Sequence, residues 1–148
     1  TALGDMIDSM VRAGFRNIVV VNGHGGNIEP IRGTWDQFMR QFEGTNLHFL
    51  SYWDTLGQTD ANELLQGGKR LPDDLPGHAQ EFETSIALAK FPGNVRGGAV
   101  SDQPDRSPAL ATAEQGNEWF ERVTERLAKF VGEVIDGQRQ SETPPFHP

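Results

Sequence analysis

The spacing of apolar residues predicts that the chain opens with a helix. Across residues 1–13, hydrophobic side chains recur at positions i, i+3, i+4, i+7 and i+8, the period of one helix face. These side chains belong to Leu3, Met6, Ile7, Met10 and Val11. Gly14 follows the pattern, and glycine is common just beyond a helix end. A helix over residues 1–13 is therefore expected.

Two short apolar runs, at residues 17–21 and 47–52, predict buried strands. Between them, apolar residues return at helical spacing from behind Asn27 to about Phe42. Asn27 is a residue type that commonly caps a helix N-terminus. A helix joining two strands favours parallel pairing. The first third of the chain therefore predicts an α/β fold.

The pattern weakens after the second predicted strand. Residues 55–77 are polar and rich in Gly and Pro, with only residues 61–65 typical of a helix, so we expect a functional loop or an interface there. His78 is expected to open a helix that ends near Phe91, and residues 93–108 are expected to be irregular. A capping-box pattern from Thr112 to Gln115 then predicts the start of a last helix, which ends at Gly137.

Composition excludes several classes of function. The chain has 148 residues, enough for one domain with a core, and a net charge of −8, which disfavours nucleic-acid binding. It has no cysteine, so a metal would need histidine and carboxylate ligands. No apolar run is long enough to span a membrane and no signal peptide opens the sequence, so a cytoplasmic location is expected.

The stretch Val19-Val-Val-Asn-Gly-His-Gly-Gly-Asn27 places one histidine, His24, among three glycines at the end of a predicted strand. Ligands bind at such strand ends in open α/β sheets. Glycine permits positive φ and leaves room for close approach. Three interpretations remain open: a phosphate cradle before a helix, a metal ligand or catalytic base, and a tight turn whose histidine only caps the chain. The lysine and hydroxyl residue of a P-loop are absent.

Two blocks of this sequence resemble the signatures of the creatininase (creatinine amidohydrolase) family. The first is Asn22-Gly-His-Gly-Gly-Asn27, and the second is His78-Ala-Gln-Glu-Phe-Glu-Thr-Ser85. Residues 107–116 are similar to the family's segment before its last helix. The resemblance implies a three-layer αβα fold with a mainly parallel sheet, of which residues 1–148 would form the C-terminal part of a single domain.

The resemblance also implies a site with two divalent metal ions (Zn, Mn or Fe) and a bridging water that attacks an amide carbonyl. His24 matches a family metal ligand, and His78 matches a histidine expected to transfer a proton or stabilise an oxyanion. Glu81, three residues after His78 and thus on the same face of a helix, is the candidate second ligand. Further expected site residues are Gly25, Gly26 and Trp53 against the substrate, and Asn22, Asn27 and Glu83 around the ligands.

Two departures separate this sequence from creatininase itself. Creatininase has a glutamate where Gly26 stands, and the family usually has glycine where Gln80 stands. Both differences argue against creatinine as the substrate. The family's earlier block of metal ligands has no counterpart in residues 1–148, so we expect a homo-oligomer, or a partner chain or upstream segment that supplies the remaining ligands.

The expected function is metal-dependent hydrolysis of a non-peptide C–N bond in a small molecule, such as a cyclic amide or a formamide. Family members that cleave a peptide end or open a cyclic ketone provide one alternative. A non-catalytic structural or regulatory subunit that keeps the fold provides another. Metal analysis of the purified protein distinguishes the enzyme from the subunit.

Overall fold

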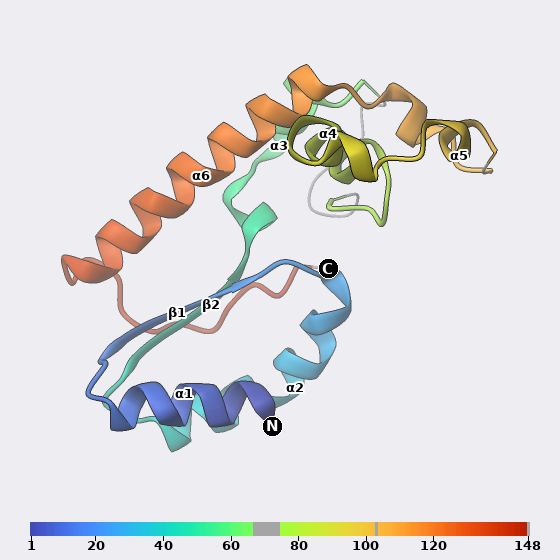
Figure 1. Ribbon diagram of the computed structural model, residues 1–148. Coiled ribbons are helices and arrows are strands. Elements are labelled where there is room, and N and C mark those ends of the chain that lie inside the picture. Colours follow the sequence, from blue (N-terminus) through green and yellow to red (C-terminus); the bar gives the residue numbers. More distant parts are fainter. Residues whose placement is uncertain (67–74, 103, 148) are drawn as a thin grey trace. The chain divides into compact units, whose positions relative to one another are not determined.

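The computed structural model describes residues 1–66, 75–102 and 104–147 (Figure 1). The chain forms two compact units. The first unit contains Thr1–Tyr52 and Leu127–His147, and the second contains Trp53–Arg126. The expectation that residues 1–148 are part of a single domain stays a prediction.

The first unit is built on two parallel strands, β1 (Asn17–Asn22) and β2 (Asn46–Ser51). Asn17 lies opposite Asn46, and Asn22 lies opposite Ser51. Both strands and their parallel pairing confirm the predictions from the apolar runs. The pairing brings the carboxyl ends of the two strands to one edge, where His24 follows β1.

Helices cover both faces of this small sheet. Helices α1 (Ala2–Arg12) and α2 (Ile28–Gln41) lie on one face (Figure 1), where the Trp35 and Phe49 rings are 5.6 Å apart. On the other face, the His48 ring packs edge-on against Phe130 of α6 (Ala113–Ile135), with centroids 5.5 Å apart. Since Phe49 and His48 are adjacent in a strand, they point to opposite faces. The first unit therefore has the predicted αβα layers.

His48 is a buried core residue, with 3% of its surface exposed. Burial lowers the pKa of its imidazole; the Glu142 carboxylate opposes this shift and the Arg139 guanidinium adds to it. A neutral ring is therefore favoured between β2 and α6.

The residues after α6 run along the outer edge of β2. The Leu47 N–H donates to Ser141 Oγ (2.7 Å), and the Asn46 side-chain amide donates to the Arg139 carbonyl (3.0 Å). Further on, the Phe146 ring packs against Phe49, with centroids 5.6 Å apart. This segment binds the Leu47 N–H, one of the backbone groups that an edge strand would otherwise leave exposed.

The second unit consists of short helices and the first part of α6. They are α3 (Gln58–Leu64), α4 (Glu81–Lys90), η3 (Pro92–Asn94), α5 (Gly97–Ser101) and η4 (Ser107–Leu110). The expectation of an irregular segment over 93–108 is wrong where these short helices form. The expected helix at 61–65 begins earlier, at Gln58. Residues 67–74 of the expected functional loop lie outside the described residues.

Helices α4 and α6 approach each other closely at Gly116. A Cβ added there would lie 1.9 Å from the Ser85 carbonyl oxygen, so no larger residue fits without moving a helix. Beside this contact, the Phe82 and Trp119 rings pack edge to face with centroids 4.7 Å apart, and both side chains are buried. The start of α6 is thereby held on the first turns of α4.

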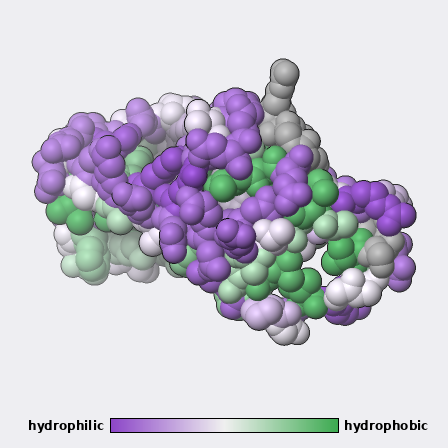
Figure 2. Space-filling view, turned by 90° about the horizontal axis from the view of Figure 1, so that it is seen from above, coloured by the Kyte–Doolittle hydropathy of each residue, from purple (hydrophilic) through white to green (hydrophobic). Residues whose placement is uncertain are grey.

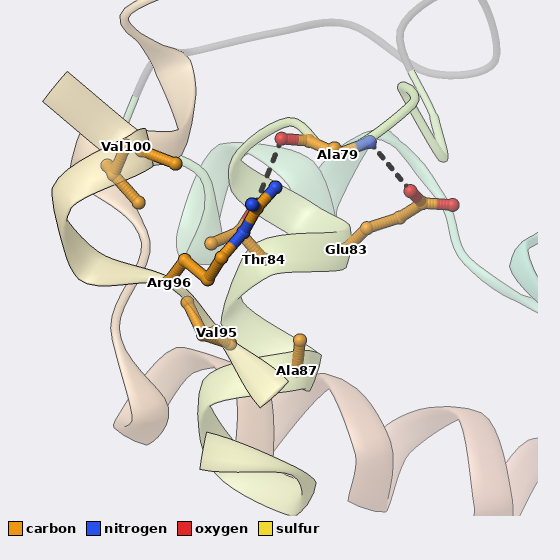
Figure 3. Close-up of a pocket in the computed structure, with 8 residues that line it drawn as sticks. Ala79, Glu83, Thr84, Ala87, Val95, Arg96 and Val100 are labelled. Atoms are coloured by element: carbon orange, nitrogen blue, oxygen red, sulfur yellow. Dashed lines mark hydrogen bonds between the residues drawn. The ribbon is translucent and has the colours of Figure 1, made fainter. Parts of the chain in front are cut away.

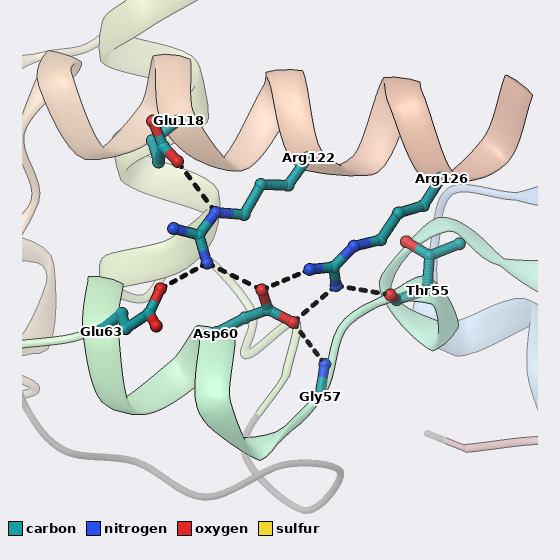
Figure 4. A network of polar contacts seen from close by, with 7 residues as sticks. All are labelled: Thr55, Gly57, Asp60, Glu63, Glu118, Arg122 and Arg126. Carbon is teal, nitrogen blue, oxygen red and sulfur yellow. Dashed lines mark hydrogen bonds and ion pairs between the residues drawn. The ribbon is translucent and has the colours of Figure 1, made fainter. Parts of the chain in front are cut away.

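A carboxylate, Asp60, ties α3 to α6 (Figure 4). Arg126 donates to both of its oxygens at 2.6 and 2.8 Å, and Arg122 donates at 2.8 Å. Burial alone would raise the pKa of Asp60, but hydrogen bonds from Arg126, the Gly57 N–H and Arg122 hold that pKa well below its ordinary value. Asp60 therefore stays ionised although its side chain is almost fully buried.

No helix among the described residues is long and apolar enough to cross a membrane. The face of the molecule drawn in Figure 2 is mostly hydrophilic, with smaller hydrophobic areas among the polar side chains.

Candidate functional site

The His24 turn is organised by the side chain of Asn22, the last residue of β1. The Asn22 amide oxygen accepts from the His24 N–H (3.2 Å), and its amide nitrogen donates to the His24 carbonyl (3.0 Å). One side chain thus holds both backbone polar groups of the candidate ligand. His24 itself is exposed.

Two further side chains complete the hydrogen bonds of Asn22. Its amide nitrogen also donates to the buried Ser51 Oγ at the end of β2 (3.0 Å), and its oxygen accepts from Asn27 Nδ2 (3.1 Å). Asn27 is the N-cap residue of α2 by position, but its side chain makes no capping bond. The expected capping role of that side chain is therefore wrong, because the Asn27 amide is used to brace the turn.

The glycines of this turn matter because they have no side chain, and not because their φ is positive. The φ angle is not positive at Gly23, Gly25 or Gly26, so the expectation that these glycines permit positive φ is wrong. A Cβ on Gly26, however, would lie 2.9 Å from His24 Nε2. The imidazole of His24 can therefore keep its position only because residue 26 has no side chain. Apart from its chain neighbours, no atom of the described residues lies within 4 Å of a Cβ added at Gly25, whose expected contact with substrate stays a prediction.

The second candidate histidine, His78, lies in a turn that side chains of α4 hold in place. The Ala79 N–H donates to Glu83 Oε2 (2.7 Å), and the Ala79 carbonyl accepts from Thr84 Oγ1 (3.1 Å) (Figure 3). Ala79 has a φ of 51°, in the left-handed region that is unfavourable for a residue with a Cβ. Glu83 and Thr84 stabilise this conformation. They thereby hold the backbone next to His78, whose side chain is exposed.

The expectation that His78 and Glu81 share one helix face is wrong. Helix α4 begins at Glu81, and the left-handed Ala79 lies between the two residues. His78 therefore belongs to the turn before the helix. Glu83 does lie in the first turn of α4, where a carboxylate is favourable near the helix N-terminus.

Glu81 is almost entirely buried, with 1% of its surface exposed. Its Oε1 accepts from the Gln66 N–H (2.6 Å) and from the Gln115 side-chain amide (3.3 Å). Gln115 was not predicted as a neighbour of Glu81, since the two residues are 34 positions apart in the sequence. The capping pattern at Thr112–Gln115 was the only signal at that position.

Two hollows of about 330 Å³ each lie near these turns. The hollow in Figure 3 lies beside the His78 turn and is lined by Ala79, Glu83, Thr84, Ala87, Val95, Arg96, Ala99 and Val100. The hollow in the first unit includes Asn22, Gly23 and Asn27 of the His24 turn. Trp53, expected against the substrate, lies directly after β2 in the turn η2 (Tyr52–Thr55) and is 2% exposed.

The candidate ligands have the right chemistry for a divalent metal ion, because imidazole and carboxylate suit Zn²⁺, Mn²⁺ and Fe²⁺. The candidate ligands are too few to complete the coordination of a metal ion. Among the described residues, no group of three or more histidine or acidic side chains could hold a metal ion. His24 belongs to the first unit, whereas His78 and Glu81 belong to the second.

Comparison with solved structures finds the same fold in creatininases. One is a creatinine amidohydrolase (creatininase) with 26% identity and a TM-score of 0.74, and another is a creatininase mutant in complex with creatine, also with 26% identity and a TM-score of 0.74. The match covers 89% of this chain in both cases, and 61% and 62% of those chains. This chain therefore spans about 61% of the length of the first matched structure.

A Bacteroides fragilis protein provisionally assigned as a creatinine amidohydrolase shares the fold at 19% identity, with a TM-score of 0.68 over 96% of this chain and 62% of that one. No curated protein matches the chain. The family model described as "Creatininase: Creatinine amidohydrolase" matches residues 1–109, which is most of the 148 residues. The resemblance of the two sequence blocks is thus confirmed, and the chain belongs to the creatininase family.

Proposed function

We propose that the protein is a metal-dependent hydrolase that acts on a non-peptide C–N bond of a small molecule, such as a cyclic amide or a formamide. The observation that carries the proposal is the His24 turn: Asn22 holds both backbone polar groups of His24, and Gly26 leaves room for its ring. A backbone held in this way limits where the imidazole can point, which favours the binding of a metal ion or ligand. Family membership supplies the reaction class.

Two divalent metal ions would supply a water acidic enough to act as a nucleophile near neutral pH. In this proposal His24 would hold metal through an imidazole nitrogen, and Glu81 through a carboxylate oxygen. The remaining ligands would come from an upstream segment, from a partner chain or from another copy in a homo-oligomer, because the described residues contain no group of three histidine or acidic side chains that could hold a metal ion.

His78 is proposed to act on the substrate itself, by donating a proton to the leaving nitrogen or by stabilising the oxyanion. Its exposure makes contact with a substrate possible, and the braced Ala79 turn fixes its position. Glu83, like Asn22 and Asn27, is assigned to holding the backbone around a site residue. Trp53, Gly25 and Gly26 are proposed to line the substrate site.

The substrate is proposed to differ from creatinine. Creatininase has a glutamate at the position of Gly26, and here a Cβ at that position would lie 2.9 Å from His24 Nε2. A glutamate therefore cannot enter this turn unless the His24 ring moves. A turn built for glycine indicates a different set of groups around the metal and a different substrate. A peptide end or a cyclic ketone is the alternative substrate class.

The test compares the wild-type protein with His24→Ala after loading with Zn²⁺, Mn²⁺ or Fe²⁺. Metal content and turnover are measured on creatinine, other cyclic amides, formamides, a short peptide and a cyclic ketone. We expect His24→Ala to lose bound metal and hydrolysis together, and His147→Ala, which removes a histidine outside the proposed site, to keep both.

Normal metal content in His24→Ala would exclude the ligand role. A wild-type protein that binds no metal and hydrolyses none of these compounds would instead support the non-catalytic subunit. Turnover of the peptide or the ketone alone would keep the hydrolase and replace the proposed substrate class.

A further inference from the structure

The surroundings of Glu81 point to an additional residue of the proposed site. A carboxylate with 1% exposure needs hydrogen-bond donors, because burying a charge without partners is very costly. Two donors meet its Oε1: the Gln66 N–H at 2.6 Å and the Gln115 amide at 3.3 Å. Of these two donors, only Gln115 uses a side chain that can be changed without altering the backbone.

The orientation of the Gln115 amide is fixed by its other partners. Its Oε1 accepts from Thr112 Oγ1 (2.7 Å), while its Nε2 donates to the Leu64 carbonyl, which can only accept. The NH₂ group must therefore face Leu64 and Glu81. Thr112 Oγ1 also accepts from the Gln115 N–H (3.1 Å), which is a capping bond at the start of α6. The capping pattern of the sequence thus also orients the side chain that reaches Glu81.

The backbone next to Gln115 is also held in place, by close packing between α6 and α4. Gly116, the next residue, lies so close to α4 that an added Cβ would be 1.9 Å from the Ser85 carbonyl oxygen. Ser85 Oγ in turn donates to the Glu81 carbonyl (2.7 Å). The first turn of α6 is therefore held against the first turn of α4 at the level of Glu81.

We propose that Gln115 is a positioning residue that holds the Glu81 carboxylate in the orientation required for metal binding. This inference rests on the proposed function, in which Glu81 is a ligand. Gln115 touches neither metal nor substrate in this role. It acts by restricting the rotation of Glu81, as hydrogen-bonding neighbours of metal ligands commonly do.

The test measures Zn²⁺ affinity by competition with a chromophoric chelator and, separately, the midpoint of unfolding in denaturant. It uses the protein together with any chain that co-purifies with it. Gln115→Met keeps the volume of the side chain but removes its donors, and Gln115→Glu places a second carboxylate beside Glu81. We expect both folded variants to bind Zn²⁺ about 10- to 100-fold more weakly than the wild type.

Arg126→Gln is the matched control. Arg126 also links α6 to α3, through Asp60, but it lies 11 residues further along α6, about 16 Å away at 1.5 Å per residue. We expect this variant to lower the unfolding midpoint and to leave Zn²⁺ affinity within about twofold of wild type. A loss of Zn²⁺ affinity equal to that of Gln115→Met would mean that loosening the helix pair is sufficient, and would overturn the positioning role.

Exchanging the two side chains, Glu81→Gln with Gln115→Glu, separates support from ligation. The exchange removes the repulsion present in Gln115→Glu and should recover part of the lost unfolding midpoint. It should not recover Zn²⁺ affinity, because the carboxylate now stands on α6. Full recovery of Zn²⁺ affinity would overturn the inference.

The single variant Glu81→Gln distinguishes the two levels of the proposal. If it loses Zn²⁺ while Gln115→Met and Gln115→Glu bind Zn²⁺ like the wild type, Glu81 is a ligand and the inference about Gln115 is wrong. If Glu81→Gln binds Zn²⁺ normally, the ligand assignment fails, and the inference fails with it.

Discussion

At the scale of single residues, the two candidate histidines share one arrangement. His24 lies in a turn whose backbone is held by Asn22, and His78 lies in a turn held by Glu83 and Thr84. In both cases, polar side chains within six residues replace the regular hydrogen bonds that a strand or helix would provide. Fixing the backbone in this way limits the motion of the imidazole before any ligand arrives, which reduces the entropy lost on binding.

Gly26→Ala tests whether space around His24 matters. The new Cβ would lie 2.9 Å from Nε2, so the imidazole must rotate away from its present position. We expect metal affinity to fall about tenfold, the scale of a disturbed ligand environment. Metal titration measures the affinity, and the ¹H–¹⁵N signals of the His24 imidazole report the rotation.

Gly23→Ala is the control for this substitution, since its φ is not positive and, in the part of the chain that the structure describes, only its sequence neighbours have atoms within 4 Å of the added Cβ. It should leave both the imidazole signals and the metal affinity close to wild type. Equal losses in the two variants would show that the turn is sensitive to any side chain, and that Gly26 has no special relation to His24.

At the scale of elements, the second unit is held together where α3 meets α6. Asp60 receives two hydrogen bonds from Arg126 and one from Arg122, and Arg122 also pairs with the half-exposed Glu63 and with Glu118 (Figure 4). The hydrogen bonds to Asp60 raise the pKa of both arginines. The central carboxylate is 4% exposed, so its interactions are screened far less than those of the outer acids.

Asp60→Asn should lower the free energy of unfolding by about 1.5–3 kcal/mol at pH 7, because hydrogen bonds to a buried charge are lost or weakened. Glu63→Gln should cost less than about 1 kcal/mol, as is usual for an exposed ion pair. Urea unfolding of the three proteins measures the difference. A larger loss from Glu63→Gln would contradict the central role of Asp60.

The Asp60 contribution should also depend on pH. Its pKa is lower in the folded protein than the value of 3.8 expected in the unfolded chain, so the unfolded state binds the proton more readily. The stabilisation is fully present above about pH 4 and is lost as pH falls below that value toward the folded pKa. The difference in unfolding free energy between wild type and Asp60→Asn should therefore shrink on acidification; a constant difference down to pH 2 would contradict the assignment.

Regular spacing of apolar residues made α1 and α2 predictable, and short continuous apolar runs made β1 and β2 predictable, because burial of a helix face or of a whole strand leaves its own pattern in the sequence. The His78 turn was not predictable in the same way. Three-residue spacing indicated a helix from His78 to Glu81, yet Ala79 is left-handed, and alanine carries no sign of that conformation. The bonds that stabilise it come from Glu83 and Thr84, which follow it in the chain.

The same limit applies to long-range contacts of the site. The residue type of Glu81 marked it as a possible ligand, but nothing local showed that it is buried against Gln66 and Gln115. Likewise Ser51, which supports Asn22 from the neighbouring strand, was known only as a strand end. Such partners depend on which elements pack together, so motif residues could be predicted while most of their neighbours could not.

At the scale of the whole molecule, donor number decides what residues 1–148 can do. A catalytic metal usually takes three protein ligands and leaves one position for water. Two metal ions would need several such ligands, whereas the described residues contain no group of three histidine or acidic side chains that could hold a metal ion. The relatives of known structure are longer, and this chain matches about 61% of the first of them.

We therefore expect residues 1–148, expressed alone, neither to retain two tightly bound metal ions nor to hydrolyse amides. Addition of a partner segment that carries carboxylate and histidine ligands should restore both properties, because His24 and Glu81 would then complete shells that they cannot close by themselves. Metal stoichiometry by mass spectrometry under native conditions, with mass in solution, measures the outcome. His24→Ala in the restored complex is the control, since added ligands alone should not replace it. A folded monomer of residues 1–148 with two bound metal ions and amide turnover would show that the chain already contains a sufficient set of ligands.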